Sequence, residues 1–195
     1  MGKQFYRRLA LLLVVSSFLT HTGVSAKNKV IEKVTYYDVS VDSVEDLKPT
    51  LVSATPLGKQ GNKYFANTDT RVSYTIMTRE QGKFCKISKV DTTVVVKMTL
   101  PRLTTNNPEV QAEFDTWYEA LLAHEQQHAD HAIETAKSLP PKLKKLGRKR
   151  ECDQALRAGS EKANQIIQAG FELDYEYDDR TQHGRTEGAW SLFDV

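Results

Sequence analysis

The segment His124-Glu125-Gln126-Gln127-His128 constrains the fold of this chain more than any other. Two histidines four residues apart lie on the same face of a helix, about one turn from each other, so both imidazoles can reach one metal ion. Apolar and helix-forming residues precede the segment, and neither proline nor glycine follows it before Pro140. The sequence therefore predicts a long helix with the histidine pair in its interior.

The same segment fits the H-E-x-x-H pattern of zinc peptidases. Glu125 is offset from His124 by roughly a third of a turn, which keeps its carboxylate off the metal but lets it reach a water bound there. We therefore predict that Zn²⁺ is the cofactor, that His124 and His128 are its ligands, and that Glu125 is the catalytic general base.

A catalytic zinc normally takes three protein ligands. His131 is seven residues from His124, which is about 10.5 Å along a straight helix and too far for one ion. We favour His183, because the glycine that follows it lets a loop approach the helix closely. The alternatives that remain open are Asp178, Glu161 and Glu172, and His131 if the helix breaks between it and His124.

Three further polar residues are candidates for supporting roles. Asp130 could orient a ligand imidazole, and Asp178 could do the same if it is not itself a ligand. Arg185, two residues from His183, could stabilise an oxyanion.

The N-terminus has the features of a secretory signal peptide. Three basic residues precede an apolar run at 9–19, and the small-residue site Val24-Ser25-Ala26 follows. The run is too short to span a membrane, and no later segment approaches the required length. We therefore predict a signal peptide at residues 1–26 and an exported protein, periplasmic or secreted, without an integral membrane segment after cleavage.

Removal of residues 1–26 takes away three basic residues and no acidic ones, so the formal net charge falls from +2 to −1. This balance gives no support to a nucleic-acid partner. Residues 27–195 have a suitable length for one domain with one sizeable core. Both cysteines, Cys85 and Cys152, lie in this part, and an even pair in an oxidising compartment predicts one disulfide.

The order of the predicted elements indicates an α+β fold. Stretches rich in β-branched and aromatic residues predict strands at 30–41, at 64–66 with 70–78, and at 84–100. Ser43 is the expected N-cap of a short helix. Residues 101–108 break the pattern, and two long helices should follow, from 109 to about 139 and from about 143 or 151 to about 175. We expect an N-terminal antiparallel sheet of about three strands and two long C-terminal helices.

The chain also resembles the bacterial domain of unknown function 922 family, described as predicted secreted zinc-dependent proteases. The residues that carry the resemblance are Tyr36 to Ser40, the Cys85 hairpin with Leu100-Pro101, the His124 to Asp130 helix segment, the Cys152 helix, and the closing Tyr177-Asp178, Thr181, His183-Gly184 and Gly188-Ala189. The resemblance implies zinc at His124 and His128, Glu125 as base, a functional His183, and pairing of the two cysteines.

These features together predict an exported zinc metallopeptidase that acts on a peptide or protein substrate. Two alternatives remain: a zinc amidase acting on cell-wall peptide, and a non-catalytic domain that binds the cell envelope.

Overall fold

The structure, a computed structural model, describes residues 27–59 and 62–193. The predicted signal peptide lies outside these residues. The helices and strands, in chain order, are β1 (Asn28–Ser40), α1 (Val44–Ala54), β2 (Gly58–Lys59), β3 (Asn62–Lys63), β4 (Asn67–Gln81), β5 (Phe84–Thr104), α2 (Pro108–Lys144), α3 (Cys152–Thr181), and the 3₁₀ turns η1 (Arg185–Glu187) and η2 (Ser191–Phe193).

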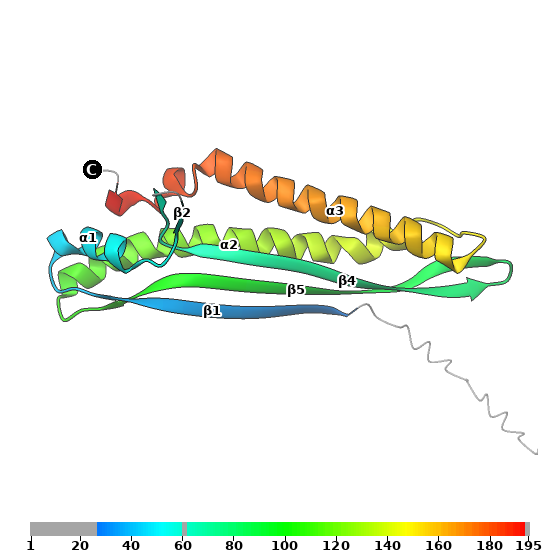
Figure 1. Cartoon of the computed structure of the whole chain (residues 1–195), viewed down its shortest axis with the longest axis horizontal. Helices are drawn as coiled ribbons and strands as arrows, with labels where there is room; N and C mark the ends of the chain where they lie inside the picture. Colours follow the sequence, from blue (N-terminus) through cyan, green and yellow to red (C-terminus); the bar gives the residue numbers. More distant parts are fainter. Residues whose placement is uncertain (1–26, 60–61, 194–195) are drawn as a thin grey trace, which may run out of the picture.

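The predicted α+β fold is confirmed: a three-stranded sheet is followed by two long helices. The strand order is β1-β5-β4, so the 21-residue β5 lies in the centre. Strands β4 and β5 form the predicted hairpin, which turns at Gly82 with a positive φ of 63°. The molecule is elongated along these strands, and both long helices lie on one face of the sheet (Figure 1).

The direction of the first strand differs from the prediction, because β1 runs parallel to β5 and the sheet is mixed. The register extends from Asn28 opposite Thr92 to Ser40 opposite Thr104. Parallel pairing requires a long crossover between the two strands. Here the chain from α1 to β4 provides that crossover, so β1 reaches the free side of β5.

Strand β5 also continues past Pro101, where a break was predicted. Pairing with β4 stops at Asn67 opposite Thr99, so beyond this point β5 pairs only with β1. A proline lacks the N–H that a central strand needs, but an edge tolerates it. Pro101 therefore lies where β5 has become an edge strand.

Both long helices extend further than predicted. Helix α2 runs through Pro140 and Pro141 to Lys144, and α3 continues to Thr181 rather than ending near residue 175. Proline inside a helix removes a backbone hydrogen bond. Leu139 and Leu143 on either side are fully buried, and this burial favours continuation of the helix. The predicted cap of α1 is confirmed, since the Asp46 N–H donates to Ser43 Oγ at 3.3 Å.

The main core lies between the sheet and α2. Alternate residues of β5 are buried on the helix side: Val94, Val96, Met98 and Leu100. They pack in one cluster with Phe114 and Trp117 of α2. Helix α3 lies over α2 and β4 (Figure 1). No helix among the described residues is long and apolar enough to cross a membrane.

The predicted disulfide between Cys85 and Cys152 is present. It joins the start of β5 to the first residue of α3, beside two backbone hydrogen bonds of 2.8 Å that link Cys85 with Lys149. The loop between α2 and α3 is thus attached to the sheet at the end of the molecule where the β4–β5 hairpin turns.

We expect replacement of both cysteines by alanine to lower the free energy of unfolding by about 2–4 kcal/mol, because the bond closes a long loop in the unfolded chain. The sequence separation is 67 residues. Urea denaturation of the oxidised protein and the double variant measures the difference. An unchanged unfolding midpoint would contradict this expectation.

Candidate metal centre

Helix α2 brings His124, Glu125 and His128 into the interior of the protein. All three residues are buried, with 5%, 6% and 8% of their surface exposed. The imidazole Nε2 atoms of the two histidines face each other at 3.2 Å, as their spacing of four residues predicts. The helix therefore presents a pair of nitrogen ligands in a site with little access to solvent.

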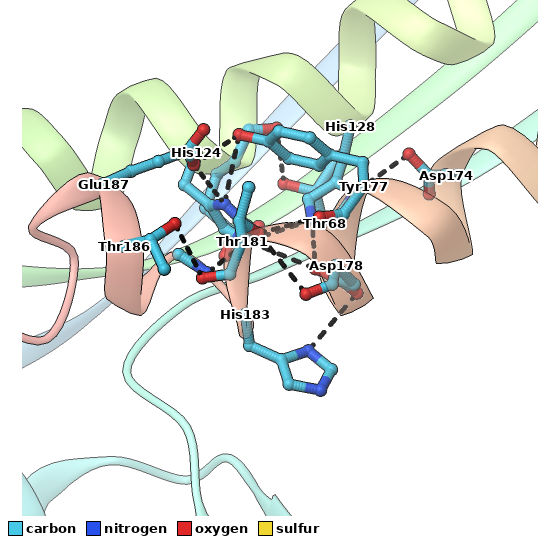
Figure 2. A network of polar contacts seen from close by, with 12 residues as sticks. Thr68, His124, His128, Asp174, Tyr177, Asp178, Thr181, His183, Thr186 and Glu187 are labelled. Atoms are coloured by element: carbon cyan, nitrogen blue, oxygen red, sulfur yellow. Dashed lines mark hydrogen bonds and ion pairs between the residues drawn. The ribbon is translucent and has the colours of Figure 1, made fainter.

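Helix α3 adds a carboxylate to this pair. Asp178 Oδ1 lies 3.3 Å from His124 Nε2 and 3.2 Å from His128 Nε2. Among the described residues, these three side chains form a group that could hold a metal ion. Figure 2 shows the two imidazoles on α2 and Asp178 on the facing turn of α3.

The spacing of these three atoms fits a bound metal ion. Tetrahedral zinc with ligands at about 2.0–2.1 Å separates neighbouring ligand atoms by about 3.3 Å. Asp178 Oδ1 is buried, and no described residue gives it a hydrogen bond of acceptable geometry. A cation between the three atoms would satisfy this oxygen and both nitrogens together. His124, His128 and Asp178 are thus a possible metal-binding triad.

Each imidazole is held by a carboxylate at its other nitrogen. His128 Nδ1 lies 2.9 Å from Asp174 Oδ1, and His124 Nδ1 lies 3.1 Å from Glu187 Oε2. The Tyr177 hydroxyl donates to the same Glu187 oxygen at 2.7 Å and its ring stacks on His124. When Nδ1–H donates to a carboxylate, Nε2 carries the lone pair that a metal needs.

The surrounding carboxylates make the site favourable for positive charge. Burial favours the neutral imidazole, but Asp174 and Asp178 outweigh it and raise the pKa of His128 to about 10. For His124, burial is likewise outweighed by Asp178 and Glu187, so its pKa is raised. The contacts with the two histidines also overcome the effect of burial on Asp178 and lower its pKa. The same charges that favour a proton here favour a metal cation.

We expect Asp174→Asn and Glu187→Gln each to weaken zinc binding by about 10–100-fold, because each change removes the charge that orients one imidazole. The zinc affinity is measured by competition with a chromogenic chelator. Asp179→Asn is the matched control, since Asp179 is an exposed neighbour on the same helix. Equal affinity in all three variants would mean that the carboxylates do not orient the imidazoles.

Glu125 lies beside the two histidines, and one of its carboxylate oxygens is unpaired among the described residues. Its Oε2 is buried, and no described residue makes a hydrogen bond with it. Burial raises the pKa of Glu125. The Thr68 hydroxyl donates to the Glu125 backbone carbonyl at 3.2 Å, which ties this turn of α2 to the start of β4. Glu125 Oε2 is therefore available to a molecule that enters the site.

The structure does not bring His183, the favoured third ligand, into the triad. Its side chain is 61% exposed, and its Nδ1 lies 3.4 Å from Asp178 Oδ2 (Figure 2). Asp178, one of the alternatives left open, occupies the position instead. His131 lies outside the triad, as its distance from His124 predicts, and its Nδ1 contacts Asp174 Oδ1 at 2.9 Å.

The other candidates lie further away. Asp130 is exposed on α2 and accepts a hydrogen bond from Gln126. The role predicted for Asp130, to orient a ligand imidazole, falls to Asp174, which contacts His128. Arg185 lies in η1, with its guanidinium 5.6 Å from the centroid of the Trp190 ring. Glu161 and Glu172 are exposed on α3 and belong to no metal-ligating group among the described residues.

Sequence reasoning missed Asp174, Tyr177 and Glu187. Asp174 is three residues before Tyr177 and four before Asp178, on one face of the helix, so this spacing carried a signal for the first two. That signal is visible only if α3 is continued beyond residue 175. Glu187 has no such signal, because the chain folds back after α3 to reach His124.

Gly184 makes this return of the chain possible. Its φ is 80°, a conformation that favours glycine. A Cβ atom there would lie 2.8 Å from the Ala189 Cβ and 3.0 Å from His124 Cγ. The glycine-flanked segment singled out in the sequence thus packs against the first histidine by its backbone, while its own histidine points outward.

A cavity of about 600 Å³ opens above the triad. Its walls come from α2, from α3, from the chain before and along the start of β4, and from the C-terminal segment. Glu125, His124, His128 and Asp178 all line it. The candidate ligands and the candidate base are therefore in contact with one space that can hold a small part of a larger molecule.

No curated protein and no solved structure matches this chain. One family profile does, over residues 34–184, a range that contains the second half of the first strand, the hairpin, both long helices and the whole triad. The range also ends at Gly184, the residue that lets the chain turn back to His124. The chain therefore belongs to the family described as bacterial protein of unknown function (DUF922).

Proposed function

We propose that this protein is an exported zinc-dependent metallopeptidase. The observation that carries the proposal is the buried convergence of His124 Nε2, His128 Nε2 and Asp178 Oδ1 within 3.3 Å of one another, next to Glu125, whose Oε2 has no hydrogen-bond partner among the described residues. Three nitrogen and oxygen ligands with a neighbouring base are what hydrolysis by a zinc enzyme requires.

The roles of the residues follow from their positions. Zinc held by His124, His128 and Asp178 would supply Lewis acidity to polarise the scissile carbonyl. Glu125 accepts a proton from a water molecule in the cavity, the water oxygen adds to the carbonyl carbon, and the proton passes to the amine as the C–N bond breaks. Asp174 and Glu187 keep the imidazoles in place throughout.

The shape of the site supports a peptide as substrate. Strand β4 lies at the outer edge of the sheet, and its first residues, 67–70, line the cavity. An open strand edge offers backbone donors and acceptors to an extended chain. A polypeptide placed along this edge would pass over Glu125, to which β4 is already linked through Thr68.

Export is supported by the disulfide, because structural disulfides persist in oxidising compartments and are rare in the cytosol. The basic and apolar pattern of residues 1–26 points the same way.

The proposal is tested with purified protein, by elemental analysis for zinc and by incubation with unfolded protein substrates and with cell-wall peptides. We expect about one zinc per chain and new amino termini that disappear when a chelator is added. Cleavage of cell-wall peptide alone would favour the amidase alternative. A zinc-loaded protein that cleaves neither substrate would exclude the peptidase.

A further inference from the structure

A second hollow, of about 540 Å³, lies beside the metal cavity. It is formed by the C-terminal segment, by α1, and by the chain just before β4. The two spaces share four wall residues: Tyr64, Phe65, His183 and Trp190. A chain that occupies the metal cavity and continues past these residues would therefore enter the hollow.

The walls of the hollow are aromatic and mutually packed. Phe65 stacks on Phe193 with ring centroids 4.1 Å apart, and it meets Trp190 edge to face at 5.8 Å. Trp190 Nε1 donates to the His183 carbonyl at 2.8 Å. Since these contacts link the C-terminal segment to the core residue Phe65, the hollow has a defined shape before a ligand arrives.

The charge of the hollow is opposite to that of the metal cavity. Its lining includes the basic residues Lys63 and Arg185 together with His183, and none of the described residues that line it is acidic. The lining of the metal cavity, in contrast, carries the carboxylates of Asp69, Glu125, Asp174 and Asp178. A substrate group that leaves the metal cavity for the hollow thus moves from acidic to basic surroundings.

We propose that this hollow is a substrate subsite for a residue that bears a carboxylate. The proposal rests on the proposed function, since it places the scissile bond in the adjacent metal cavity. Lys63 and Arg185 attract the carboxylate, and Tyr64 and Trp190 contact the carbon atoms that carry it. The carboxylate belongs either to an acidic side chain or to the C-terminus of the substrate.

The test measures binding of peptides to the zinc-loaded Glu125→Gln variant, which should leave them uncleaved. The probes are alanine-based hexapeptides with an N-terminal fluorophore and an amidated C-terminus, with Glu, Gln or Lys placed at each position in turn. By fluorescence polarisation we expect Glu at one position to bind about tenfold more tightly than Gln, and Lys to bind more weakly than both. The preference should decrease as salt is added.

A second set of probes separates the two sources of the carboxylate. It carries Gln throughout and ends in a free C-terminus. Tight binding of this set, with no preference for Glu among the amidated peptides, assigns the hollow to a substrate C-terminus. A preference for internal Glu assigns it to an acidic side chain.

The double variant Lys63→Gln with Arg185→Gln should lose the preference. The matched control is Lys33→Gln with Arg79→Gln, which removes the same charges from exposed positions on β1 and β4. Circular dichroism verifies that both variants are folded. The proposal would be overturned if Glu and Gln peptides bound the parent protein equally and a free C-terminus gave no tighter binding than an amidated one. A carboxylate preference that survives the first double variant would overturn it as well.

Failure of this subsite is distinguishable from failure of the peptidase. Hydrolysis by the wild-type protein without any carboxylate preference would remove the subsite and leave the proposed function. A carboxylate preference in a protein that hydrolyses no peptide would leave a carboxylate-binding hollow and remove the peptidase.

Discussion

Replacement of Glu125 by glutamine should lower kcat for peptide hydrolysis by about 10²–10⁴-fold while zinc binding is retained. The reason is that Glu125 lines the cavity beside the triad but belongs to no ligand set. Glutamine has nearly the same shape, yet it lacks a basic carboxylate. The measurement is kcat on a fluorogenic peptide found in the substrate screen, together with zinc per chain by elemental analysis.

The matched control is Glu119→Gln, the same substitution at an exposed position on the same helix. We expect it to leave both kcat and zinc content unchanged. The thermal unfolding temperature of Glu125→Gln should not fall, because the change removes a buried carboxylate whose Oε2 has no partner among the described residues. Full activity in this variant would exclude Glu125 as the base. Loss of zinc would instead make it a ligand.

The second large effect concerns the identity of the third ligand. Asp178→Ala should weaken zinc binding by more than about 100-fold, beyond the range seen when a supporting residue is removed. His183→Ala should weaken it by less than about tenfold, because this imidazole is mostly exposed and touches the triad only through Asp178. The dissociation constants are measured by competition with a chelator of known affinity.

His128→Ala is the positive control for loss of zinc, and Asp179→Ala shows whether any change on this turn of α3 has the same effect. Circular dichroism verifies that each variant keeps its helices. If zinc is lost with His183 and kept with Asp178, the third ligand is the histidine favoured by the sequence. In that case the loop after α3 must move inward when the metal binds.

The histidine pair and the fold class were predictable because their signals are local. A helical segment with H-E-x-x-H spacing places both imidazoles on one face wherever the helix lies. Gly82 marked the turn of the hairpin, and the N-cap residue Ser43 marked the start of α1. Cys85 and Cys152 were the only pairing available.

The sequence favoured His183 over Asp178 as third ligand because the end of α3 is set by tertiary contacts. Residues 175–179, Tyr-Glu-Tyr-Asp-Asp, include several weak helix formers, which suggested that the helix stops there. In the structure Tyr177 stacks on His124, and Asp178 contacts both imidazoles, so the helix continues to Thr181. Intrinsic preference was overridden by the site itself.

The direction of β1 was missed for a similar reason. Short loops predict which neighbouring strands form a hairpin, and β4 and β5 are such a pair. The partner of β1 lies more than 60 residues along the chain, at register pairs such as Asn28 with Thr92. Nothing local distinguishes a parallel from an antiparallel approach over that separation.

Helix α3 is held at its two ends by different chemistry. Its first residue, Cys152, is covalently attached to the sheet, and its last turns meet α2 through the polar triad. The helix therefore has two attachments. A reductant can remove the disulfide, and the other attachment depends on which ion lies between the three electron-pair donors of the triad. With a metal bound in the triad, a chelator and a reductant would release opposite ends of the same helix, and a compartment that is both oxidising and supplied with metal would keep both ends in place.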